Sequence, residues 1–156
     1  MNKQQNNISR FYSFVCAAVL LMFSAASNAE SIYTKFFSDV AVSGYDTVAF
    51  FTENKPVKGD KKYKAEYMGA EWYFSSEKNK SMFEANPDKY RPQYGGHCAW
   101  AVAANNAKAP GNVEYWRIVD DKLYLNYNKD VQDKWIQDIP GFIEAANKNW
   151  PELGKE

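Results

Sequence analysis

The chain has 156 residues, of which 46% are hydrophobic, 17% aromatic and 24% charged, a composition that excludes disordered, collagen-like and coiled-coil proteins. Lysine plus arginine equals aspartate plus glutamate at 19 each. No basic stripe with interleaved aromatic residues accompanies this balance, so we expect no nucleic-acid partner. The single histidine excludes catalytic sites built from several imidazoles.

The first 29 residues have the order of a secretory signal peptide. Two basic residues precede an uncharged, mostly apolar run over residues 11–26, and small residues at a cleavage position follow at 27–29. The apolar run is shorter than the roughly 20 residues that a membrane-spanning helix needs. We therefore predict that residues 1–29 are removed and that residues 30–156 form a single secreted domain, located in the periplasm, with no membrane contact after cleavage.

Three segments before the first predicted helix have the β-branched, aromatic or alternating composition of strands: residues 47–51, 61–67 and 71–74. The second and third form a hairpin around a turn that contains Gly69. Ser75 or Ser76 can cap a helix over residues 77–85. Asp46, just before the first segment, is expected to fix its loop through side-chain hydrogen bonds.

The second half of the domain predicts a loop, a short helix, a hairpin and two terminal helices. Their predicted positions are residues 87–96, 99–104, 114–127, 130–138 and 140–148, with Trp150 and Pro151 closing the last helix. Hairpins with interleaved and terminal helices predict the α+β class, with a small antiparallel sheet packed on one face by several short helices.

Spaced pieces of the sequence resemble a YHS domain of the secreted, stand-alone branch. They are S-G-Y-D-T-V-A-F-F at 43–51, Y-F-S-S at 73–76, N-P-D-K-Y at 86–90, Y-G-G-H-C-A at 94–99 and K-L-Y-L-N-Y-N at 122–128. The resemblance extends over residues 30–156. It implies a relation to small treble-clef-like metal modules and a link to heavy-metal handling.

The positions that supply soft ligands in metal-type members differ in this chain. The resemblance implies an early cysteine-glycine pair and a later F-C-S-x-x-C stretch, where this chain has Ser43, Ser75 and Asn79. A tetrahedral zinc or copper site needs thiolate or imidazole from several directions. The resemblance therefore implies the fold more strongly than it implies the family's usual metal site.

Cys98 is the one thiol left after removal of the leader, so an intramolecular disulfide is excluded. Gly95 and Gly96 permit close approach to the backbone, and the helix predicted next would lower the pKa of the thiol. We predict a site at this turn, with Cys98 and His97 as ligands of a copper or zinc ion and Tyr94, Gly95 and Gly96 against a small ligand. The side chains of adjacent residues point in different directions. A glycine turn, or a second chain that contributes the same two residues, could still bring a thiolate and an imidazole onto one ion.

Each of these residues also has an ordinary structural interpretation. Cys98 can be a packed side chain in the core, and His97 can be a hydrogen-bonded histidine where the family commonly has an aromatic residue. Met68 and Met82 are candidate thioether donors for Cu(I) or parts of the core. The tyrosines and tryptophans can line a cleft for a planar ligand or form the core.

The signatures of nucleotide-binding, hydrolase, thioredoxin-like and cytochrome c proteins are absent from the sequence. A binding module for a soft metal ion or a small ligand is therefore favoured over an enzyme. Two alternatives stay open: a thiol redox protein that uses Cys98 with a lowered pKa, and a structural or protein-interaction module without a ligand. The oligomeric state has no signature in the sequence.

Overall fold

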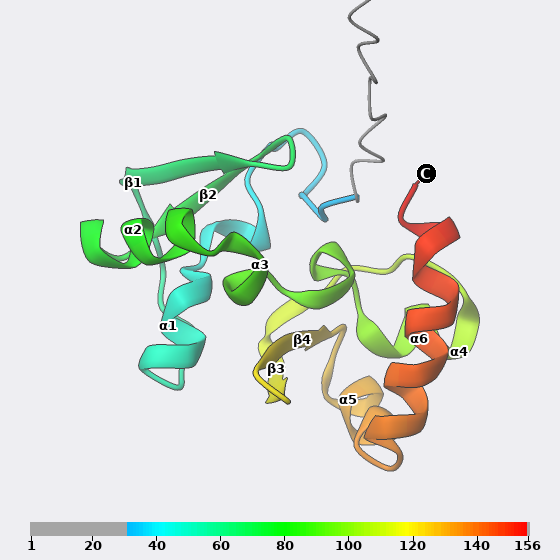
Figure 1. Cartoon of the computed structure of the whole chain (residues 1–156). Helices are drawn as coiled ribbons and strands as arrows, with labels where there is room; N and C mark the ends of the chain where they lie inside the picture. Colours follow the sequence, from blue (N-terminus) through cyan, green and yellow to red (C-terminus); the bar gives the residue numbers. More distant parts are fainter. Residues whose placement is uncertain (1–30, 156) are drawn as a thin grey trace, which may run out of the picture.

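A computed structural model describes residues 31–155 (Figure 1), so the predicted signal peptide lies outside the described residues. These residues form six α-helices and two antiparallel hairpins, which confirms the α+β class. The two hairpins are separate two-stranded sheets, β1 with β2 and β3 with β4, and not the one sheet that the sequence predicted.

The elements of the first half surround the β1–β2 hairpin. They are η1 (Val42–Gly44), α1 (Thr47–Thr52), β1 (Asp60–Tyr67), β2 (Ala70–Phe74), α2 (Glu77–Ala85) and α3 (Pro87–Tyr90). The predicted hairpin is confirmed, and Ser76 caps α2 by accepting a hydrogen bond from the backbone N–H of Asn79 at 3.1 Å.

The predicted strand over residues 47–51 is wrong, because this segment is the helix α1. Asp46 is its N-cap, and Oδ1 accepts hydrogen bonds from the backbone N–H groups of Val48 at 2.9 Å and Ala49 at 3.3 Å. Residues 47–50 are all buried. A helix without a polar face has no helical hydrophobic period, so an apolar run of this length resembles a buried strand.

The elements of the second half surround the β3–β4 hairpin. They are η2 (Gln93–Gly96), α4 (Ala99–Asn105), β3 (Asn112–Val119), β4 (Lys122–Asn126), α5 (Lys129–Trp135) and α6 (Ile139–Leu153). The predicted loop over residues 87–96 therefore contains α3 and η2. The side chain of Asn86 starts α3 by accepting a hydrogen bond from Lys89 N–H at 3.2 Å.

The two C-terminal helices are confirmed, with different ends. Asn128 caps α5, which begins at Lys129, one residue before the predicted start, because the Asn128 side chain accepts from the backbone N–H of Val131 at 2.9 Å. Asp138 caps α6, which continues through Pro151 and ends at Leu153, beyond the predicted end at residue 148. None of the helices within residues 31–155 has the length and apolar character that crossing a membrane requires.

Strand β4 lies between two hydrophobic clusters. Leu123 and Leu125 belong to the first cluster, which contains Val48, Phe50, Trp72, Phe74 and Phe83. Tyr124 belongs to the second, which contains Tyr94, Ala99, Val102, Trp135 and Ala146. Successive side chains of a strand point to opposite faces, so one buried strand contributes to both clusters.

Candidate functional site

The thiol of Cys98 lies at the N-terminus of α4, as the sequence predicted, but it is buried. Cys98 is 1% exposed, and its Sγ–H donates to Oδ1 of Asn126 at 3.8 Å. Burial raises the pKa of the thiol, although nearby backbone N–H groups act in the opposite direction. The expected lowering of the thiol pKa is therefore wrong, because removal from water outweighs the end of a short helix.

His97 is also buried, and its ring has other neighbours than the thiol. Its ring centroid lies 5.5 Å from the centroid of the Tyr33 ring and 5.5 Å from that of the Trp150 ring, and the residue is 6% exposed. Nδ1 lies 2.9 Å from the carbonyl oxygen of Tyr94. A carbonyl only accepts, so this contact places a proton on Nδ1. His97 and Cys98 have different partners, as expected for adjacent residues in extended backbone.

The two glycines of the turn are approached closely by the chain itself. The N–H of Tyr33 donates to the carbonyl oxygen of Gly95 at 2.8 Å, and a Cβ on Gly95 would lie 1.8 Å from the carbonyl oxygen of Ser31. The carbonyl oxygen of Gly96 lies 2.1 Å from the place of a Cβ on Gly111. The space that the sequence assigned to a ligand at the glycine backbone is thus filled by residues of this domain.

Tyr94 belongs to the second hydrophobic cluster. Its ring packs on Tyr124 and Trp150, its hydroxyl donates to Oδ1 of Asn147 at 3.0 Å, and burial raises its pKa. Ligand binding at Tyr94, Gly95 and Gly96 and metal binding at His97 and Cys98 stay predictions, and both would require this turn to open.

A buried carboxylate occupies the place where the resemblance implies cysteine ligands. Asp46 is 0% exposed. Its Oδ2 accepts from the backbone N–H of Ser75 at 2.8 Å, from the hydroxyl of Ser75 at 2.6 Å and from Nδ2 of Asn79 at 2.7 Å. With the two bonds to Oδ1 in α1, five neutral donors stabilise this carboxylate. The expected role of Asp46 in fixing its loop is confirmed.

This donor set does not fit the implied thiolate metal site. Ser75 and Asn79 use their side chains as hydrogen-bond donors to Asp46, and hydroxyl and amide groups are poor ligands for soft cations. Among residues 31–155, no three histidine, cysteine, aspartate or glutamate side chains are placed to hold a metal ion. The cluster therefore links α1 to β2 and α2 as a structural element.

Residues 48–94 match the family model described as YHS domain. The match confirms the resemblance to the YHS family over these residues. No curated protein and no solved structure matches the chain. The matched region runs from α1 into η2 and includes Ser75 and Asn79, whereas His97 and Cys98 lie beyond it.

A cleft of about 390 Å³ opens beside the buried turn. Three tyrosines from separate segments line it, Tyr33, Tyr45 and Tyr127, and we call it the tyrosine cleft. Its other lining residues are Lys35, Ser43, Pro110, Gly111, Asn112, Val113 and Glu114. Tyr33 contacts the ring of His97, and His97 lies opposite Pro110 in a β-bridge in which the N–H of Cys98 donates to the carbonyl oxygen of Ala109 at 2.9 Å. The predicted turn therefore supports the wall of this cleft.

Charged groups lie at the edges of the tyrosine cleft. Lys35 and Glu114 are both exposed and supply one positive and one negative group. The ammonium group of Lys58 lies 4.6 Å from the ring centroid of Tyr45, and Tyr127 is 51% exposed. The cleft can therefore offer a ligand the faces of aromatic rings together with one positively and one negatively charged side chain.

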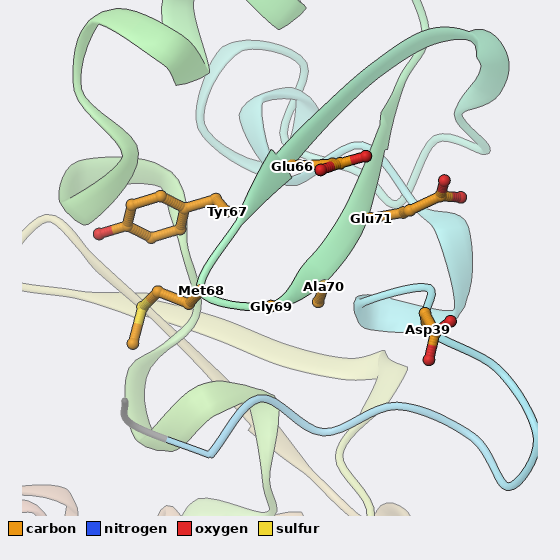
Figure 2. Close-up of a pocket in the computed structure, with 7 residues that line it drawn as sticks. All are labelled: Asp39, Glu66, Tyr67, Met68, Gly69, Ala70 and Glu71. Carbon is orange, nitrogen blue, oxygen red and sulfur yellow. The ribbon is translucent and has the colours of Figure 1, made fainter. Parts of the chain in front are cut away.

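A second pocket, of about 360 Å³, lies at the turn between β1 and β2 (Figure 2). Figure 2 shows the side chain of Met68 on the other side of the turn from the carboxylates of Asp39 and Glu71. Hydrogen bonds from Lys64 and Tyr73 hold the pKa of Glu71 below its usual range. Because Glu71 is engaged and Met68 points away, this pocket does not provide a set of converging metal donors.

The buried thiol predicts slow alkylation. We expect iodoacetamide to modify Cys98 at least about a hundredfold more slowly in the native protein than in urea, because reaction requires the structure around the thiol to open. The native rate should also stay low at pH 8–9, since a raised pKa keeps the thiol protonated as the pH increases. Fast native labelling at neutral pH would restore the redox alternative.

Proposed function

We propose that this YHS-type protein is secreted and acts as a binding module rather than as an enzyme. It holds a small planar ligand in the tyrosine cleft. The observation that carries the proposal is a cleft of about 390 Å³ with three tyrosines at its wall. The leader-like sequence of residues 1–29 supports secretion into the periplasm.

The chemistry of the lining favours a flat, heteroaromatic ligand. Tyrosine rings bind such molecules by stacking or edge-to-face contact, and Tyr33, Tyr45 and Tyr127 come from three different segments of the chain. Lys35 and Glu114 can bind polar groups at the edge of the ring. The volume lies at the low end of the roughly 300–1,000 Å³ usual for small-molecule sites.

A soft metal ion at Cys98 is less well supported. The ligand in such a site is the thiolate, whereas burial raises the pKa of Cys98 and the residue is 1% exposed. The same two observations weaken the thiol redox alternative. Tyr94, Gly95, Gly96 and His97 contribute to the proposed function by supporting the cleft and need not touch the ligand.

Ligand-observed NMR with a set of planar heteroaromatic fragments, including indole and quinoline carboxylates, tests the proposal on residues 30–156. We expect saturable binding that Tyr127→Ser and Tyr33→Ala each weaken at least about tenfold, since each removes an aromatic contact. Phe36→Ser, which removes an 89% exposed ring outside the cleft, should leave binding unchanged.

Absence of saturable binding, or equal binding by wild type and both tyrosine variants, would contradict the proposal. A parallel titration with Cu(I), using Cys98→Ser as the comparison, separates the metal alternative. Stoichiometric binding that is lost in Cys98→Ser would assign the function to the thiol in place of the tyrosine cleft.

A further inference from the structure

A tight turn near the start of the described chain carries two exposed phenylalanines. Phe36 is 89% exposed and Phe37 is 96% exposed, and their ring centroids lie 4.2 Å apart. The N–H of Ser38 donates to the carbonyl oxygen of Lys35 at 2.9 Å and closes the turn around them. In Figure 1 this light-blue segment arches at the edge of the molecule. We call Phe36 and Phe37 the aromatic turn.

The turn itself does not require these aromatic side chains. Phe37 has φ of 61°, and the third position of a turn with positive φ is one that glycine strongly prefers. A bulky residue there is uncommon. The two rings pack on each other rather than on the core, so they form an ordered apolar projection into solvent that gives the fold little stabilisation.

Three lysines that form no ion pair in the described part of the chain lie beside the aromatic turn, and one of them, Lys58, donates a hydrogen bond to the carbonyl oxygen of Ser43 at 2.5 Å. Lys35, Lys58 and Lys61 line a hollow of about 320 Å³, and the hollow beneath the aromatic turn shares Lys35 and Ser38 with it. No ion pair joins any of these three lysines to a carboxylate within residues 31–155. Asp39 is the one carboxylate among the residues that line the two hollows.

We propose that the aromatic turn docks this protein on an anionic lipid surface, with the phenylalanine rings in the interfacial region and the three lysines against the headgroups. Shallow insertion of apolar side chains and attraction of nearby lysines to anionic lipids are the two contributions that hold a peripheral protein at a bilayer. The sequence predicted no membrane contact after cleavage because its apolar run lies in the leader, and two adjacent phenylalanines give no comparable signal.

A second copy of the chain fits this surface less well. Four phenylalanine rings, two from each copy, bury at most about 1,000 Å², which is below the roughly 1,200 Å² of a stable interface. Two copies joined at the aromatic turn would also bring two sets of three lysines together. Lipid headgroups instead supply negative charge opposite those lysines and accept a small apolar projection.

Flotation of residues 30–156, which contain all described helices and strands, with lipid vesicles tests the proposal. We expect binding to vesicles of phosphatidylcholine with 30% phosphatidylglycerol, weakened by high salt, and little binding to phosphatidylcholine alone. The double variant Phe36→Ser with Phe37→Gly should lower the partition coefficient at least about tenfold. The glycine suits the backbone of the turn, so this loss would report the missing rings and not unfolding.

Lys35→Glu with Lys61→Glu should weaken binding to the anionic vesicles at least about tenfold, whereas Lys78→Glu with Lys108→Glu, on other segments of the chain, should have a smaller effect. Tyr127→Ser, which damages the tyrosine cleft, should bind vesicles normally, so the two proposals can fail separately. Failure of the wild type to bind anionic vesicles overturns the proposal. Binding that survives loss of both rings overturns it as well, as does dimerisation through the aromatic turn without vesicle binding.

Discussion

Replacement of Asp46 by alanine should lower the free energy of unfolding by about 3–5 kcal/mol, the largest effect that we expect from a single polar substitution here. The carboxylate is 0% exposed and accepts hydrogen bonds from Ser75, Asn79 and the first turn of α1. Its removal leaves several buried donors without an acceptor, and each such donor is costly because water cannot reach it. Urea unfolding monitored by tryptophan fluorescence measures the change.

Asp138→Ala is the matched control for this substitution. Asp138 is also an N-cap aspartate, with Oδ1 accepting from Gly141 N–H at 3.0 Å, but it is exposed. Its loss should cost about 1 kcal/mol, the usual contribution of an N-cap. Similar losses in both variants would mean that the bonds from Asp46 to Ser75 and Asn79 contribute little.

Gly95→Ala should lower the free energy of unfolding by about 2–4 kcal/mol or detach the first residues of the domain. Gly95 has φ of +59°, and the added Cβ would lie 1.8 Å from the carbonyl oxygen of Ser31. A backbone atom cannot move aside as the end of a flexible side chain can, so either the turn or the Ser31 segment must shift. Urea unfolding, together with limited proteolysis near residue 33, distinguishes the two responses.

Gly69→Ala separates backbone strain from the steric clash. Gly69 has φ of +74°, but no atom lies within 4 Å of the place of its Cβ, so its substitution should cost about 1 kcal/mol. An equally small effect of Gly95→Ala would show that the Ser31 segment moves freely, and the turn would then be accessible to a ligand after all.

The fold class and most elements could be predicted because their sequence signals are local. The alternating side chains of β1, the turn Asp120-Asp121 between β3 and β4 and the serine before α2 are signals that act within a few residues. The helix α1 could not be predicted from its apolar run, because the donors that stabilise Asp46 at its start include Ser75 and Asn79, about thirty residues away.

The candidate site was harder to predict because burial depends on the whole fold. The sequence places Cys98 correctly at the start of α4, but the exclusion of water from its sulfur and the crossing of Ser31 over Gly95 arise from distant segments. The tyrosine cleft likewise joins residues from four parts of the chain. The sole signal for it was the high tyrosine content, which equally indicates an ordinary core.

The position of β4 has a consequence for how the protein unfolds. Leu123 and Leu125 lie in one cluster and Tyr124 in the other, so displacement of this strand exposes apolar surface of both at once. Because both clusters need β4, neither half can unfold while the other keeps its hydrophobic cluster intact. We therefore expect the two halves to unfold together in a single cooperative transition. Excursions that bring water to Cys98, which pairs with Leu125, are then rare events close to global denaturation.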